Sequence, residues 1–385
     1  MRSVFRPLPS LLALLGFGLV LAGCDSGTSM TEELPPEEAQ TQMETADRDL
    51  SSDVDALVSS GEFATTVQGL FSTPTTTASG KTHQQPLGVT LLDHLDTELE
   101  TTDGRLDFGA STGVYEWAPQ EGDWVYAGSS DRIVLKFPAS EDAPGNNATF
   151  TLSAYSDTGV TIDGTTEYLP ARISASLTVE GLGEVFAVDL LNTTFYDSQV
   201  NGSQVPKSFF LEVLTVPHRH TYEWSSPSKR EFEFAVDLSR AEGDRLVLGL
   251  LANVALKSDF DQVSGPQGID ELSGEISLGP DVTIDYTVQV DELTTLEGDP
   301  TAEQVNNRIS AVMKYKGQKV GDLRFDRENG ILLVYNDGTS EPLGQAFDNT
   351  LASLAGSSAG GVTNAVTGAV TTAAQTVRDA VSAVF

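Results

Sequence analysis

Few residues in this chain have the types and spacing that metal binding or catalysis requires. His218 and His220 are two residues apart, so a strand would place both imidazoles on one face, as a metal site needs. Such a site also needs a third ligand, and nothing in the sequence brings His83 or His94 near. We therefore expect two exposed histidines beside a turn at Pro217.

A serine near the C-terminus matches the spacing of a hydrolase nucleophile elbow, in Gly356-Ser357-Ser358-Ala359-Gly360. That motif needs a strand before the serine and acid and histidine partners after it. The residues before Ser358 are not strand-like, and the last histidine, His220, lies far upstream. Chance in a segment rich in Gly, Ser and Ala explains this match better than a hydrolase does.

Other candidate groups are equally unspecific. The acid-rich residues 259–270 lack the alternating ligand positions of a calcium loop. Trp117, Trp124 and Trp224 could stack on sugar rings, but aromatic residues in strands are more often core residues or cross-strand pairs. The sequence therefore predicts no catalytic, cofactor-binding or metal site, no cofactor, and a protein that is not an enzyme.

The single cysteine of the chain, Cys24, has a more specific context. Arg2 and Arg6 form a basic start, and residues 11–22 form an apolar run that is shorter than the roughly 20 residues needed to cross a bilayer. A basic start, a short apolar run and small residues at its end are typical of an export signal. On these features alone, an ordinary secretory signal with a chance cysteine remains the alternative.

The tetrapeptide Leu21-Ala22-Gly23-Cys24 resembles the lipobox of bacterial lipoproteins. The resemblance implies cleavage before Cys24, a thioether-linked diacylglycerol on Cys24, and an amino terminus acylated with a fatty acid such as palmitate. Two or more acyl chains hold a protein stably on a membrane, whereas one holds it only marginally. It also implies a location in the cell envelope, on a membrane facing the periplasm or the exterior.

The composition excludes one class of partner. The 385 residues include 56 Asp and Glu against 22 Lys and Arg, a net charge of −34. Nucleic acid is disfavoured, because phosphate binding needs a basic surface. The acids are spread along the whole chain, which favours a surface adapted to high salt over a cation store or an acidic interaction tail. With Cys24 lipidated, no thiol would remain for a disulfide.

The pattern along the chain predicts four parts. Residues 1–23 form the signal peptide, and residues 24–45 a lipid anchor followed by a polar, acidic tether. Residues 46–345 contain apolar residues first at helical spacing, over about 44–60 and 87–99, and then at strand spacing. Residues 346–385 form a tail rich in Ala, Thr and Val whose stripe at helical spacing predicts a helix, either packed on the sheet or mobile.

Alternation of apolar and polar residues dominates the middle of the chain. It is clearest in residues 172–179, 231–238 and 281–290, and weaker in residues 133–137, 150–155, 185–191, 209–213, 246–256, 309–315 and 331–335. Such alternation indicates strands with one buried and one solvated face. The fold class we predict is mainly β with flanking helices: a large curved antiparallel sheet or half-barrel, with N-terminal helices and a C-terminal helix.

Several short motifs resemble a group of Bacteroidota-type lipoproteins of unknown function. They are Gly113-Val114-Tyr115-Glu116-Trp117 with Trp124, Ile133-Val134-Leu135-Lys136-Phe137-Pro138, Leu169-Pro170-Ala171-Arg172-Ile173-Ser174-Ala175-Ser176-Leu177, and more weakly residues 319–323 and 335–339. The resemblance implies an antiparallel β body behind a lipid anchor, and it implies no activity. A sheet of this kind behind a lipobox also has a distant architectural likeness to periplasmic carriers of lipids and lipoproteins.

Two functions of different classes follow. The first is a cell-envelope lipoprotein whose body is a non-catalytic binding or structural module. The alternative is a carrier of an apolar, lipid-like ligand in the concavity of the sheet, which residues 246–251 suggest because they are apolar at both alternating positions. An envelope glycan hydrolase using two acids is a distant third. The expected partners are the membrane, through the lipid on Cys24, and, under the carrier alternative, an apolar small molecule or lipid. The sequence does not indicate a protein partner.

Overall fold

The computed structural model describes residues 33–59 and 101–350, with gaps at 103–104, 122, 140–142, 144, 163–164, 201–202, 264–265 and 297–299. Cys24, the helical segments expected within residues 60–100, and the tail after residue 350 lie outside the described residues. The chain divides into two compact units. The first holds residues 1–55, 195–208 and 222–356, and the second holds residues 56–194, 209–221 and 357–385.

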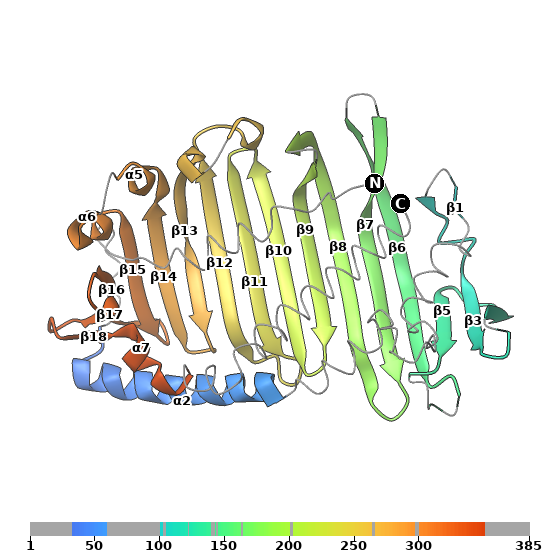
Figure 1. Cartoon of the computed structure of the whole chain (residues 1–385), viewed down its shortest axis with the longest axis horizontal. Helices are drawn as coiled ribbons and strands as arrows, with labels where there is room; N and C mark the ends of the chain where they lie inside the picture. The colour runs from blue at the N-terminus through green and yellow to red at the C-terminus, as the bar shows by residue number, and fades with distance from the viewer. Residues whose placement is uncertain are drawn as a thin grey trace, which may run out of the picture. The chain divides into compact units, whose positions relative to one another are not determined.

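The fold is mainly β, as the sequence predicts, and its main sheet has sixteen strands (Figure 1). From β18 to β5, each strand pairs with the strand before it in the sequence. Strand β3 then pairs with β5, and β4 with β3. The sheet therefore has two free edges, β18 and β4, and does not close. Strand β3 lies between β5 and β4, and it is antiparallel to β4 but parallel to β5. This one parallel pair departs from the expected antiparallel sheet.

The strands are β1 (Thr101–Thr102), β2 (Arg105–Leu106), β3 (Gly113–Ala118), β4 (Asp123–Gly128), β5 (Ile133–Phe137), β6 (Ala148–Ile162), β7 (Thr165–Val179), β8 (Gly183–Val200), β9 (Ser203–Thr215), β10 (His218–Ser228), β11 (Glu231–Arg240), β12 (Leu246–Leu256), β13 (Ile269–Leu278), β14 (Val282–Gln289), β15 (Ile309–Tyr315), β16 (Gln318–Asp326), β17 (Gly330–Tyr335) and β18 (Ser340–Pro342). The helices are α2 (Pro36–Ser59), η1 (Phe260–Gln262), η2 (Pro266–Gly268), α5 (Val290–Thr294), α6 (Ala302–Asn306) and α7 (Leu343–Ala346).

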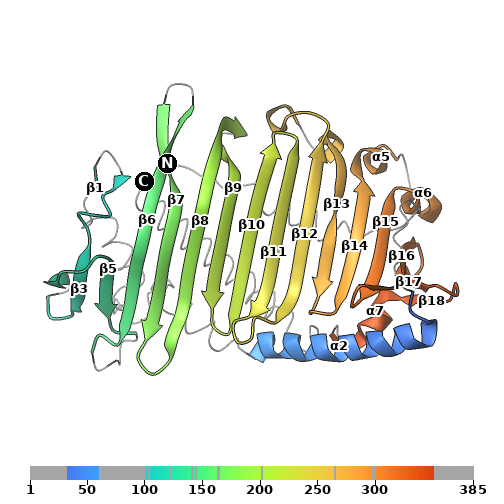
Figure 2. The ribbon, with the colours of Figure 1, turned by 180° about the vertical axis from the view of Figure 1, so that it is seen from behind.

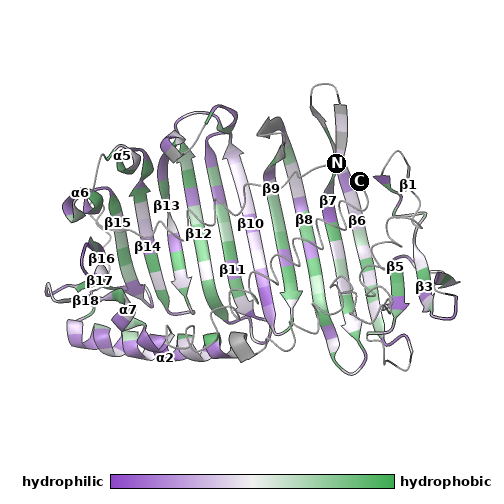
Figure 3. Ribbon diagram, in the orientation of Figure 1, coloured by the Kyte–Doolittle hydropathy of each residue, from purple (hydrophilic) through white to green (hydrophobic). Residues whose placement is uncertain are grey.

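In the first unit, one face of the sheet is apolar from strand to strand. A single row of directly opposed residues crosses β11 to β15, namely Val236, Leu250, Ile276, Ile284 and Met313. The neighbouring row on the opposite face, Asp237, Gly249, Ser277, Thr283 and Lys314, contains no large apolar side chain. Figure 3 shows the resulting alternation of apolar and polar residues along the strands. The alternation of apolar and polar residues in the sequence therefore gives the sheet one apolar and one polar face.

Helix α2 runs along one end of the strands of the first unit, as Figures 1 and 2 show from opposite sides. Its buried residues Ala39, Met43, Ala46, Leu50 and Val54 recur every three to four positions and form one stripe. No helix in the described part of the chain is both long and apolar enough to span a membrane.

The start of α2 corrects the predicted end of the tether. Residues 24–45 were expected to be solvated, but α2 already begins at Pro36, and Ala39 and Met43 are fully buried. The helical pattern is weak here because the first two turns contain only two residues of the buried stripe, Ala39 and Met43, and the rest are mainly Glu, Gln and Thr. Pro36 suits the first turn of a helix, since its missing N–H has no partner to lose there.

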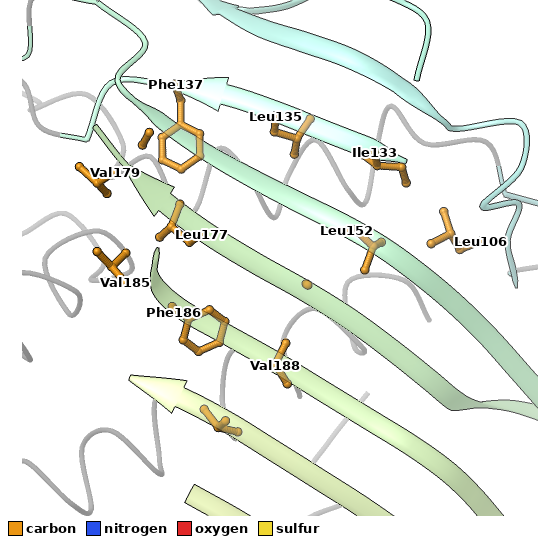
Figure 4. Close-up of a cluster of buried hydrophobic side chains, with 13 residues drawn as sticks. Leu106, Ile133, Leu135, Phe137, Leu152, Leu177, Val179, Val185, Phe186 and Val188 are labelled. Carbon is orange, nitrogen blue, oxygen red and sulfur yellow. The ribbon is translucent and has the colours of Figure 1, made fainter. Parts of the chain in front are cut away.

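The second unit has its own apolar core on one face of β5 to β8 (Figure 4). Leu135, Phe150, Leu177 and Phe186 lie directly opposite one another on these four strands. Leu135 and Leu177 are fully buried, and Trp117 and Trp124 pack against the same cluster. The motif residues 113–117, 124 and 133–138 thus lie on neighbouring strands of this unit and contribute to packing.

One glycine of the first unit makes room for a tyrosine. Tyr286 reaches across β13 at Gly274, and its hydroxyl donates to the carbonyl oxygen of Leu251 on β12 at 3.0 Å. A β-carbon on Gly274 would lie 1.9 Å from that oxygen and 3.0 Å from the Tyr286 hydroxyl. Glycine is required here because backbone and ring approach each other too closely for any side chain.

We expect Gly274→Ala to destabilise the protein by about 1–3 kcal/mol, because the added methyl group displaces the Leu251 carbonyl or the Tyr286 ring. Thermal unfolding followed by circular dichroism measures the effect. Gly128→Ala, at the end of a strand with no atom near the added β-carbon, is the matched control and is expected to be neutral. Equal stability of the two variants would contradict this account of Gly274.

Candidate functional site

The most specific arrangement in the described residues is the place where the N-terminal segment joins the first unit. Glu33 forms a parallel bridge with Lys319 of β16, and the Leu34 N–H donates to the Lys319 carbonyl at 3.0 Å. The Asn336 side chain donates to the Leu34 carbonyl at 3.3 Å, and Leu34 is buried. The chain is therefore fixed to β16 and to the turn after β17 nine positions after Cys24.

Helix α2 continues from this junction and is held by a buried carboxylate near its far end. The Asp53 side chain is only 3% exposed, and its two oxygens lie 2.9 Å from Arg240 Nη2 and 2.9 Å from Arg245 Nε. Both arginines flank the turn between β11 and β12. The two arginines offset the cost of burying the Asp53 carboxylate. Their ion pairs with Asp53 therefore specify where the helix docks.

A second buried carboxylate ties α2 to the segment after α7. Asp47 accepts four hydrogen bonds, from the N–H and side-chain amide of Asn349 and from the N–H and hydroxyl of Thr350, at 2.7–2.9 Å. Burial alone would raise the pKa of Asp47, but the donors of Thr350 and Asn349 stabilise its charged form and lower the pKa overall. Asp47 is therefore ionised at neutral pH and structural in role.

We expect Asp53→Asn to lower the free energy of unfolding by about 1–3 kcal/mol, less than for a fully buried pair because both arginines are partly exposed. Urea denaturation measures the change, and hydrogen exchange of the α2 amides localises it.

The control for this experiment is Asp49→Asn on the same helix. Asp49 is 58% exposed and lies 4.0 Å from Arg245, so its loss is expected to cost less than about 0.5 kcal/mol. If the two variants lost the same stability, Asp53 would have no special part in docking the helix.

The two histidines lie on β10, and their expected exposure was wrong. His218 and His220 are on the same face of the strand and each is only 7% exposed. Arg219 between them is on the other face, with Nε 3.6 Å from Glu212 Oε1 on β9. Burial lowers the pKa of His220 to about 4, so it is neutral at physiological pH. The sequence predicted a turn at Pro217, but β10, a strand of eleven residues, begins at the next residue.

His220 makes the second unit sensitive to acid. Since its pKa is about 4 when folded and 6.5 when unfolded, the unfolded chain binds more protons in this window, and stability falls as pH falls through it. Between about pH 7.5 and about pH 4.5, His220→Leu is expected to lose about 2–3 kcal/mol less stability than the parent. Parallel urea titrations of the two proteins at both pH values measure the difference, and equal losses would contradict it.

The other sequence candidates have ordinary structural environments or lie outside the described residues. Trp117 and Trp124 form an edge-to-face pair with ring centroids 5.6 Å apart, and Trp224 packs on Phe232 at 5.2 Å. In the acid-rich stretch, Asp259 accepts from Arg230 and Asp261 from Lys229. Ser358, His83 and His94 lie outside the described residues.

The apolar face of the first unit is shut over some strands and open over others. On β14 and β15, Ile284 and Met313 are 3% and 0% exposed. On β11 to β13, Leu238 and Ala252 of the same face are buried, but most of its other side chains are half-buried and Leu248 is 47% exposed. We call this region the open apolar strip, formed by Phe232, Phe234, Val236, Leu248, Leu250 and Ile276.

The buried side chains described above have structural roles in packing and in docking α2, and the open apolar strip could bind an apolar group. Within the residues that the structure describes, no three His, Asp, Glu or Cys side chains gather as a metal site would need. Sequence reasoning missed Asp47 and Asp53, because nothing in the sequence distinguishes a buried acid from the many exposed ones among 56 Asp and Glu. Comparison with family models, with curated proteins and with solved structures gives no match to this chain.

Proposed function

We propose that this protein is a lipid-anchored lipoprotein of the cell envelope, and that its β body is a non-catalytic binding or structural module. The lipobox-like Leu21-Ala22-Gly23-Cys24 supports the anchor. Glu33 and Leu34 are fixed to β16, so a lipid on Cys24 would hold the β body close to the membrane.

The length of the segment between anchor and body limits how far the body stands from the membrane. Eight residues, 25–32, separate Cys24 from Glu33. A fully extended chain rises at most about 3.3–3.6 Å per residue, so the junction on β16 lies within roughly 30 Å of the lipid. Under the proposed anchor, the β15–β16 and β17–β18 turns, which surround this junction, would lie within about that distance of the membrane.

Replacement of the cysteine tests the anchor. In a bacterial host fed an alkyne-labelled fatty acid, the parent chain is expected to take up label and sediment with membranes, and Cys24→Ser is expected to do neither, because the acceptor sulfur is absent.

The matched control keeps one cysteine in the chain but moves it. Cys24→Ser combined with Ser29→Cys restores a thiol five positions downstream, outside the lipobox-like tetrapeptide, and is expected to remain unlabelled. Unchanged membrane partition of Cys24→Ser would overturn the anchor.

A second function, a carrier of an apolar ligand, is favoured by the open apolar strip. Its exposed Leu248 lies opposite Leu238 and Leu278, so an apolar ligand there would meet side chains of three adjacent strands. Each square ångström of apolar surface that the ligand covers contributes about 25 cal/mol.

Solvent extraction of the purified protein tests the carrier. We expect a co-purified lipid-like molecule, and several-fold less of it from Leu248→Gln, since an amide cannot replace the apolar contact. Leu182→Gln, at a leucine that is 63% exposed in the turn between β7 and β8, is the control and is expected to leave the yield unchanged. Absence of any extracted apolar molecule would exclude the carrier.

A further inference from the structure

The two edges of the main sheet differ in how they are protected against pairing. One edge, β18, has three residues, ends in Pro342, and runs directly into α7. Shortness and proline are ordinary ways of blocking an edge strand, because proline offers no N–H. The other edge, β4, has six residues and contains no proline, lysine or arginine. No described strand pairs with its outer side.

Strand β4 also exposes apolar side chains on both faces. Tyr126 is 58% exposed and Val125 is 43% exposed. Tyr126 and Trp124 lie on the core-facing side, where they pack edge-to-face on Tyr115 and Trp117, with ring centroids 5.7 and 5.6 Å apart. Val125 alternates with them and lies on the opposite face.

Charge is scarce along this edge, which is unusual in a chain with a net charge of −34. Between Asp123 and Asp131, residues 124–130 carry no charge. Asp123 begins the strand, and its carboxylate accepts a hydrogen bond from the Trp124 N–H at 2.7 Å. Two copies of so acidic a chain approach each other with least repulsion where the facing residues are uncharged, as residues 124–130 are.

We propose that β4 is a self-association edge, at which a second copy of this chain adds its own β4 antiparallel to the first. A two-fold axis perpendicular to the sheet at Val125 places Val125 opposite its own copy and Trp124 opposite Tyr126 of the other copy. The two Asp123 residues then lie opposite Ala127 and far from each other. The pairing gives each exposed Tyr126 an aromatic neighbour and continues the core-facing side of the sheet across the interface.

This inference goes beyond the proposed function and does not depend on lipidation of Cys24. It also predicts the effect of salt. The Debye length falls from about 10 Å at 0.1 M to about 3 Å at 1 M, so screening weakens the repulsion between two acidic bodies and favours the dimer. A basic partner would instead bind more weakly as salt rises.

Disulfide trapping tests the pairing directly. Residues opposite each other in an antiparallel pair have Cα atoms about 4.5–5.5 Å apart, within the range that a disulfide bridges. Val125→Cys in the purified full-length chain is expected to form a dimer under mild oxidation at high salt, with a yield at least about fivefold that of Leu182→Cys.

Three comparisons decide the outcome. Leu182→Cys, at an apolar site away from β4 that is more exposed than Val125, measures random collision, and the parent chain measures any dimer formed through Cys24. Sedimentation of Val125→Glu, which places two carboxylates opposite each other, is expected to show loss of the dimer that the parent and Leu182→Glu retain. Equal trapping of Val125→Cys and Leu182→Cys, or an unchanged dimer in Val125→Glu, would overturn the proposal.

Discussion

The opposition of apolar side chains on neighbouring strands is the interaction on which this structure depends. In each unit the backbone ladder aligns the strands so that apolar residues meet apolar residues, as in the row Val236, Leu250, Ile276, Ile284 and Met313. A shift of one residue in the register of any strand would move all its apolar side chains to the polar face. Register is therefore set by the burial of one face, and close contacts such as Tyr286 over Gly274 fix it locally.

Charge has two distinct uses in this chain. Most acids in the described part of the chain are exposed or partly exposed to solvent. Two of them, Asp47 and Asp53, are buried on one helix and hold it to parts of the chain roughly 200 and 300 residues away, through arginines in one case and neutral donors in the other. The same helix follows directly from the junction at Leu34, so under the proposed anchor any pull on the lipid is transmitted to the sheet through these contacts.

The sequence predicted the strands well and their environments less well. Strands β5, β12 and β15 have the predicted bounds, and in β5 and β15 every second residue is buried in the core. The early start of α2 was missed because its first two turns have few apolar residues, and the burial of His218 and His220 was missed because a local turn signal says nothing about neighbouring strands. The parallel pairing of β3 with β5 and the choice of Asp53 as a buried anchor depend on contacts between distant residues, which composition and spacing do not encode.

Hydroxyl-radical footprinting read by mass spectrometry tests the central claim most directly, because it reports side-chain exposure along the apolar face. The account predicts that Met313 and Ile284 are strongly protected relative to the unfolded chain, while Leu248, which belongs to the same face three strands away, reacts readily. Rapid oxidation of Met313 in the folded protein, or equal protection of Met313 and Leu248, would contradict a sheet whose apolar face is buried over β14 and β15 and exposed at Leu248 on β12.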